Sequence, residues 1–245
     1  MVRIGNFLFH YRNGLFPIVY LLLFFPARPI FPDDYLAVLI GLVVALSGQI
    51  LRAVTIGLDY IIRGGKNRQV YAERLVQGGI FAHCRNPLYV GNFLIILGVG
   101  LASNSLLFLA LAIPFFLFAY AAIIAAEEAF LQQKFGAEFS EYCGRVNRVI
   151  PNFSGFCKTR EGMEFNWKRL IAKEYGSMFI WTAAIIAVTF KNLWRNGEYE
   201  RHPFLIWILG FLFLLITIAY GVARYLKKKG LLQEESPLPP PVSAD

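Results

Sequence analysis

Apolar residues in this chain are gathered into six long blocks, and this grouping restricts the fold more than any other feature of the sequence. The blocks span roughly residues 15–31, 35–58, 88–104, 106–126, 176–191 and 203–223. Each approaches the ~17–25 residues that an α-helix needs to cross the hydrocarbon core of a bilayer. With 57% hydrophobic and only 16% charged residues, the chain is far too apolar for an ordinary soluble domain. The sequence therefore predicts an all-α fold, a polytopic transmembrane helical bundle of about six spans, with five and seven as the alternatives.

The basic residues follow the loops between these blocks. If the N-terminus is cytoplasmic, nineteen Lys and Arg residues lie on the inner side and only four lie on the outer side. This asymmetry is what the positive-inside rule describes, and it accounts for the net charge of +8 without a nucleic-acid partner. We expect both termini in the cytoplasm and insertion in a bacterial inner (plasma) membrane.

A short polar motif within residues 78–93, Arg85-Asn86-Pro87-Leu88-Tyr89, leads into the third block. Asn is favoured at the N-cap of a helix and Pro at its first position, so a helix is predicted to begin here. Its unpaired N–H groups would face the cytoplasmic loop, where they and Arg85 can hold a carboxylate. The alternative is an interfacial anchor, with the arginine snorkelling and the tyrosine in the aromatic belt.

A pair of acidic residues, Glu127 and Glu128, lies at the cytoplasmic end of the fourth block. Because the third and fourth blocks form a hairpin, we expect this pair to face the start of the third helix. Acidic residues are unfavourable at the C-terminus of a helix, so the helix is predicted to continue to Gly136, with a second short helix over 137–146. A carboxylate beside a helix N-terminus can complete a pocket for a zwitterion; the alternative is a solvated helix face.

Other polar residues carry weaker signals. Arg52 lies inside the second block, where an arginine must face the bundle or a cavity, so a structural or pocket-facing role is expected. The sequence 201–204, Arg-His-Pro-Phe, imitates the first motif at the opposite surface, where we interpret it as an interface anchor. The three histidines and three cysteines lack the spacing of a metal site or a disulfide framework, so neither is expected.

In their order and spacing, the motifs of residues 48–152 resemble the isoprenylcysteine carboxyl methyltransferase and phospholipid methyltransferase family. The matching residues are Leu75-Val76, Gly78-Gly79-Ile80-Phe81, Arg85 to Gly91, Glu127 to Leu131, Phe135-Gly136, Phe139, Tyr142 and Val146 to Pro151. Members of this family are integral membrane enzymes that use S-adenosylmethionine. The resemblance implies cofactor contacts at Leu75, Val76, Phe81, Asn86, Pro87, Leu88, Tyr89 and Glu127; the charge of Arg85 adds one more candidate.

The resemblance implies a membrane-embedded, S-adenosylmethionine-dependent methyltransferase. Its substrate would be lipophilic and could enter sideways from the bilayer, with O-methylation of a carboxylate and N-methylation of a lipid amine both open. Two positions depart from the family: Asn86 stands where its members often have His, and Ile123 lies near where eukaryotic members have an arginine that binds prenylcysteine. The second departure argues against a prenylcysteine substrate.

Two other functions stay open as alternatives. Membrane sterol reductases, which use NADPH, have a similar Arg-His-Pro-x-Tyr element and an ending similar to residues 142–151, although the acidic pair favours methyl transfer. The other alternative is a non-enzymatic transporter or scaffold. Transporters usually place polar residues at mid-membrane, whereas here the polar residues gather at one surface.

The organisation expected from these patterns has four parts. An N-terminal transmembrane hairpin covers 1–47, and a methyltransferase-like core with a cytoplasmic cofactor pocket covers 48–152. A C-terminal extension with two further spans covers 153–232. The last part, 233–245, contains four prolines and is expected to be a disordered tail.

Overall fold

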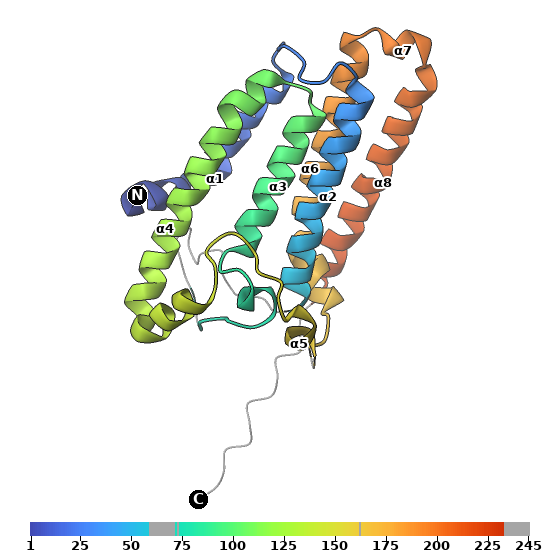
Figure 1. Ribbon diagram of the computed structural model, residues 1–245. Coiled ribbons are helices and arrows are strands. Elements are labelled where there is room, and N and C mark those ends of the chain that lie inside the picture. The colour runs from blue at the N-terminus through green and yellow to red at the C-terminus, as the bar shows by residue number, and fades with distance from the viewer. Residues whose placement is uncertain (59–71, 73, 162, 233–245) are drawn as a thin grey trace, which may run out of the picture.

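The computed structural model describes residues 1–58, 72, 74–161 and 163–232, which contain helices and no strand. In chain order the elements are α1 (Val2–Tyr20), η1 (Leu21–Phe24), α2 (Asp34–Leu58), η2 (Gly79–Ala82), α3 (Pro87–Ala102), α4 (Leu106–Arg145), α5 (Phe156–Arg160), α6 (Trp167–Arg195), α7 (Glu198–Arg201) and α8 (Pro203–Lys228) (Figure 1). The tail predicted over 233–245 lies outside the described residues.

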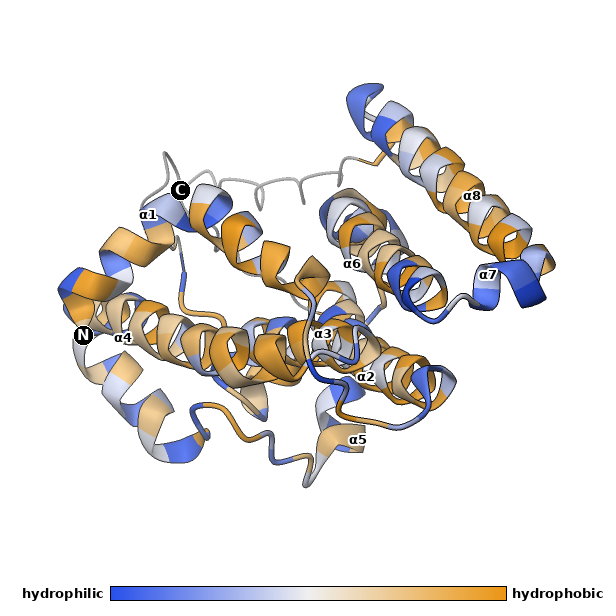
Figure 2. Ribbon diagram, turned by 90° about the horizontal axis from the view of Figure 1, so that it is seen from above, coloured by the Kyte–Doolittle hydropathy of each residue, from blue (hydrophilic) through white to orange (hydrophobic). Residues whose placement is uncertain are grey.

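Among the described residues, five helices are long and apolar enough to cross a membrane: α1 with η1, α2, α4, α6 and α8. α3 is apolar too, but its 16 residues fall short of a full crossing. Hydrophobic residues run along these helices, and hydrophilic residues gather at the helix ends and in the connections (Figure 2). The prediction of an all-α polytopic bundle is confirmed.

The predicted limits of the first span, 15–31, are wrong. The helix begins at Val2, well before the apolar block, and ends with η1 at Phe24. The end is set by Phe25, whose backbone is extended (φ −71°, ψ 139°) because the residue before a proline is disfavoured in the helical region. Residues 25–31 of the predicted block are therefore largely apolar in sequence but do not continue the helix.

The fifth span is longer than the predicted 176–191. α6 covers Trp167–Arg195 because Asn166 starts the helix before the apolar block, its side chain accepting a hydrogen bond from the Arg169 amide at 2.8 Å. The Arg169 guanidinium donates to the carbonyl oxygens of Ile56 and Gly57 at 2.7 and 2.8 Å. These bonds join the polar start of α6 to the end of α2.

The prediction for the end of the fourth span is confirmed. α4 continues past the acidic pair and kinks at Gly136, whose positive φ of 52° is accessible to glycine. The chain then turns back as a short helix whose Phe139 and Tyr142 are buried against Leu131 and Ala72. This small core lies at the end of the bundle where α3 begins, which we call the site end.

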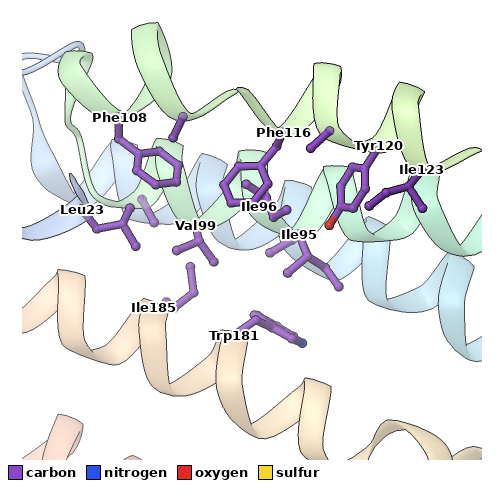
Figure 3. Close-up of a cluster of buried hydrophobic side chains, with 14 of the residues drawn as sticks. Leu23, Ile95, Ile96, Val99, Phe108, Phe116, Tyr120, Ile123, Trp181 and Ile185 are labelled. Atoms are coloured by element: carbon purple, nitrogen blue, oxygen red, sulfur yellow. The ribbon is translucent and has the colours of Figure 1, made fainter. Parts of the chain in front are cut away.

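The long helices pack around α3. α1 lies along α4, α2 lies along α3, and α6 contacts both α2 and α3, while α8 lies outside against α6 (Figures 1 and 2). Figure 3 shows the buried core between them, formed by Phe116 and Tyr120 of α4, Val99 of α3, and Trp181 and Ile185 of α6. The division of the chain at residues 47 and 152 stays a prediction.

Glycines bring α2 and α3 into backbone contact. A methyl group added at Gly98 would lie 2.5 Å from the Gly41 carbonyl oxygen, and one added at Gly48 would lie 2.6 Å from the Gly91 carbonyl oxygen. Small residues at such crossings let membrane helices approach closely and gain van der Waals contact. The contact fixes the depth and rotation of α3, and with them the position of its first residues.

Gly98→Ala should therefore destabilise the protein, because the added methyl group has no room between the two backbones. Overpacking of this kind costs about 1–3 kcal/mol, which should lower the midpoint of thermal unfolding in detergent. Gly210→Ala in α8 is the matched control, since nothing lies within 4 Å of a methyl group added there. Equal midpoints for the two variants would argue against the close α2–α3 contact.

Candidate functional site

The first residues of α3 form the centre of the site. Asn86 is the N-cap and Pro87 the first helical residue, as predicted, and the amides of Tyr89 and Val90 donate to the Asn86 carbonyl oxygen at 3.1 and 3.2 Å. Pro87 has no N–H, so the Leu88 amide is left as the donor without a partner among the described residues. This amide and the positive end of the helix dipole favour an anion at this point.

The expected capping role of the Asn86 side chain is wrong. Asn86 makes no side-chain cap; its Nδ2 instead donates to Glu128 Oε1 at 3.3 Å and to the Arg148 carbonyl oxygen at 3.1 Å. Both acceptors come from α4 and the segment after it. Asn86 thus joins the start of α3 to the end of α4.

The adjacent glutamates of α4, Glu127 and Glu128, have different partners. Glu127 is buried and accepts a hydrogen bond from the Tyr89 hydroxyl at 2.6 Å. Glu128 instead forms ion pairs with Arg85 at 3.3 Å and with Arg148 at 2.8 Å. Adjacent residues of a helix point in different directions. The Glu127 carboxylate therefore lies in the cavity lining beside Tyr89, whereas the Glu128 carboxylate binds the two arginines that flank the site end.

Arg85 is bound to the end of α4. Its Nη1 donates to the carbonyl oxygens of Cys143 and Val146 at 2.9 and 3.1 Å. Its backbone amide donates to the Asn147 carbonyl oxygen at 2.9 Å. A cation at the C-terminal carbonyls of a helix is favourable because of the helix dipole. The guanidinium therefore stabilises the site end but does not line the cavity described next.

A cavity of about 810 Å³ lies between α1, α2, α3, α4 and α6. Six of the nine predicted cofactor residues line it: Phe81, Asn86, Pro87, Leu88, Tyr89 and Glu127. Val76 does not line the cavity but is buried against Phe81, which does. Leu75 packs on the small core of the site end. The structure thus brings together residues from two helices and a loop that are far apart in the sequence.

The loop over the cavity is held by buried hydrogen bonds. The Tyr142 hydroxyl donates to the Phe81 carbonyl oxygen at 2.7 Å, and His83 bonds through Nδ1 to the Asn152 carbonyl oxygen at 2.6 Å and through Nε2 to Thr159 Oγ1 at 3.0 Å. Over the described part of the chain, no three His, Cys, Asp or Glu side chains gather as a metal site would require. The bonds of Tyr142 and His83 therefore hold the loop in which Phe81 lies.

A buried ion pair also lines the cavity. Arg52 of α2 pairs with both carboxylate oxygens of Glu174 of α6, with Nε 2.9 Å from Oε2, and also donates to Asn92 of α3. Glu174 is only 1% exposed. The pocket-facing position expected for Arg52 agrees with its place in the cavity lining.

The ion pair continues as a chain of hydrogen bonds toward the core. Gln49 Nε2 donates to Glu174 Oε2 at 3.0 Å, and the Trp181 indole N–H donates to Gln49 Oε1 at 2.9 Å. Glu174 and Trp181 were not among the predicted site residues. The available signal was Arg52 itself, since an arginine in a span needs an acidic partner and Glu174 lies at the inner end of the fifth block.

Residues 35–138 match the family model described as phospholipid methyltransferase. This segment is therefore similar in sequence to that family. It contains nearly all of α2, all of α3 and most of α4. All eight cofactor residues that the resemblance names lie within it, and so does Arg85. The family resemblance predicted from the motifs is confirmed, and α1 and α6 lie outside the matched segment.

Two curated relatives carry names that refer to metal resistance. The cobalt-zinc-cadmium resistance protein CzcN of Cupriavidus metallidurans is 40% identical over 93 residues, 38% of this chain and 40% of the relative. The nickel-cobalt-cadmium resistance protein NccN of Alcaligenes xylosoxydans xylosoxydans is 35% identical over 85 residues, 35% of this chain and 39% of the relative. The chain thus aligns with about two fifths of the length of each. No solved structure matches it.

Glu174→Ala should destabilise the protein strongly, because it leaves the Arg52 guanidinium buried without its carboxylate. Breaking a buried ion pair costs about 3–5 kcal/mol, whereas replacing both members by apolar residues is often neutral. We expect a large drop in the thermal midpoint in detergent and substantial recovery in the double variant Arg52→Met/Glu174→Leu. Glu164→Ala, at an exposed position, is the control. A Glu174→Ala midpoint equal to that of the control would contradict a structural role for the pair.

Proposed function

We propose that this protein is a membrane-embedded methyltransferase that uses S-adenosylmethionine. The observation that carries the proposal is the meeting of Glu127 with the start of α3, through the 2.6 Å bond from Tyr89, in one cavity of a methyltransferase-like segment. At about 810 Å³ the cavity falls in the range typical of cofactor and small-molecule sites, roughly 300–1,000 Å³.

The side chains in the cavity suit the charges of this cofactor. The Leu88 amide and the N-terminus of α3 would take the carboxylate of its methionine part. The Glu127 carboxylate, oriented by the Tyr89 hydroxyl, would take a polar or cationic group. Phe81 offers an apolar surface for the adenosine part, with Val76 packed behind it.

The remaining predicted contacts have an indirect role in this proposal. Arg85 holds the end of α4, and Leu75 packs on the small core below the loop. When bound, S-adenosylmethionine supplies a methyl group that its sulfonium already activates. The protein residues would then orient the acceptor and keep water out of the reaction.

We propose a lipophilic acceptor that enters from the bilayer between α1 and α6. α1 packs on α4 whereas α6 packs on α2 and α3, and both line the cavity with apolar residues. At the far end Lys191 of α6 donates to the carbonyl oxygens of Leu23 and Ser103 at 2.9 and 2.8 Å and joins α6 to η1 and α3. Access would therefore lie nearer the site end. O-methylation and N-methylation both fit this route.

The names of the relatives describe resistance to metal ions, and the proposal relates to that property only through the membrane. A methyltransferase acting on a membrane component could change the envelope of a cell exposed to metals. The reductase alternative gains no support from Tyr142, whose hydroxyl is buried and donates to the Phe81 carbonyl oxygen. NADPH therefore serves as the comparison in the test.

The test is a titration of the detergent-purified protein with S-adenosylmethionine and NADPH side by side. We expect saturable binding of S-adenosylmethionine, weakened about tenfold or more in Glu127→Gln, because a hydrogen bond to a charged group is worth about 1.5–3 kcal/mol. Glu141→Gln, at an exposed position of the same helix, is the matched control. Binding of NADPH instead would move the protein to the reductases, and binding of neither would leave the resemblance as one of fold.

We also propose that the site end faces the cytoplasm, as the distribution of basic residues indicates. A membrane-impermeant maleimide should then label exposed Cys157 in inside-out vesicles and not in intact cells. Cys84 should stay unlabelled until the protein is denatured, because it is buried and burial raises the pKa of its thiol to about 11. Labelling of Cys157 in intact cells would reverse the orientation.

A further inference from the structure

A second, smaller cavity of about 240 Å³ lies at the end of the bundle opposite the site end, where the start of α2, the end of α6 and α7 come together (Figure 1). α6 contributes Thr189, Asn192 and Asn196, whose spacings of three and four residues place them on one face of the helix. α2 contributes Asp34 and Val38, one turn apart. We call this cavity the acidic pocket, because three carboxylates line it.

Polar contacts join α2 to α6 at the mouth of the acidic pocket. Asp34 of α2 accepts a hydrogen bond from Asn196 Nδ2 at 2.6 Å and forms an ion pair with Arg195 at 3.0 Å. These contacts neutralise the Asp34 carboxylate within the protein. They also hold the two helix faces close together, so a ligand in the pocket would meet residues of both.

The inner part of the acidic pocket contains a buried oxygen atom without a partner. Asn192 lines the pocket, and its side chain is only 2% exposed. Its Nδ2 donates to the Ala102 carbonyl oxygen at 3.0 Å, which fixes the orientation of the amide, whereas its Oδ1 has no hydrogen-bond partner among the described residues. A buried acceptor is unfavourable until it receives a donor, so Asn192 indicates a ligand with an N–H or O–H group.

Two further carboxylates, those of Asp33 and Glu198, make the acidic pocket attractive to a cation. Within the described residues, Asp33 accepts a hydrogen bond from the Tyr35 amide at 2.9 Å and has no ion pair. Glu198 pairs only with exposed Arg201 and His202, at 3.3 and 3.6 Å, and exposed pairs contribute little. Both carboxylates interact electrostatically with the Tyr35 hydroxyl, which places them on the same side of the pocket.

We infer that the acidic pocket binds a small primary ammonium ion, with its N–H groups directed at Asn192 Oδ1 and at the carboxylates of Asp33 and Glu198. An ammonium group has three donors and no acceptor, and the groups that the pocket leaves unpaired are acceptors. Apolar Val38 and Leu193 offer a surface for a short alkyl chain. The volume corresponds to about eight water molecules at ~30 Å³ each, which admits only a small ligand.

A metal ion suits the acidic pocket less well. Among the residues that the structure describes, no three His, Cys, Asp or Glu side chains come together as a direct coordination shell requires. The pocket also lies at the opposite end of the bundle from the cavity proposed for S-adenosylmethionine. The inference therefore assigns a second binding site, independent of the proposed methyl transfer.

The test measures equilibrium binding of four probes to the protein in a non-ionic detergent at low ionic strength: n-propylammonium, n-propanol, tetramethylammonium and Ca²⁺. n-Propanol has a donor without the charge, and tetramethylammonium has the charge without an N–H. n-Propylammonium should bind saturably and at least about tenfold more tightly than the other three, because only it combines the charge with several donors.

Variants connect this binding to the acidic pocket. Asp33→Asn and Glu198→Gln should each weaken binding of n-propylammonium about two- to fivefold, as expected for partly exposed charges. Asn192→Leu should weaken it about tenfold, and Asn192→Asp should tighten it, because the aspartate keeps the acceptor and adds a charge. Glu200→Gln is the matched control, since Glu200 is exposed on α7 and lies outside the pocket lining.

Four results would overturn the inference. Absence of saturable n-propylammonium binding would leave the pocket to water, and equal affinity for tetramethylammonium would remove the role of the N–H donors. Tighter binding of Ca²⁺ would make the pocket a metal site. Equal weakening in Glu200→Gln would show that only the net charge of the surface acts. If Asn192→Leu does not fold, Asn192→Asp and the two carboxylate variants decide the outcome.

Discussion

Arg52 and Glu174 form a buried ion pair between α2 and α6, and the arrangement of the bundle depends on it. A guanidinium in hydrocarbon is unfavourable unless an anion accompanies it, so α6 cannot move away from α2 without leaving a charge in an apolar environment. The pair also holds Asn92 of α3, and through Gln49 it reaches Trp181 in the core. Together with the bonds from Arg169 to the end of α2, this interaction joins α6 to the segment that matches the family.

Local signals in the sequence predicted much of the site end. The Asn-Pro step fixed the start of α3, because proline has a helical φ and lacks the N–H that a first residue does not use. Gly136 predicted the kink in α4, since a positive φ there suits glycine. The hairpin of α3 and α4 predicted that Glu127 would lie at the depth of Tyr89. Each of these inferences needed only neighbouring residues or one turn between two helices.

Contacts between distant segments could not be predicted in the same way. Asn86 was expected to cap its own helix, but the carboxylate of Glu128 and the carbonyl of Arg148 lie within reach of its side chain. Glu174 is 122 residues from Arg52, and no local pattern connects them. The limits of the first and fifth spans were misplaced for a related reason, since a helix end is decided by capping and proline rather than by where the apolar residues stop.

The bridge from Lys191 to the carbonyl oxygens of Leu23 and Ser103 joins α6 to η1 and to the end of α3, at the opposite end of the bundle from the site end. From Arg12 to Phe24, α1 and η1 rise by about 18 Å, taking about 1.5 Å for each residue. An apolar ligand that lay along this face of the cavity would therefore have about 18 Å of helix beside it before it met that bridge. The length of a ligand would then be a criterion of selection separate from the chemistry of the site end.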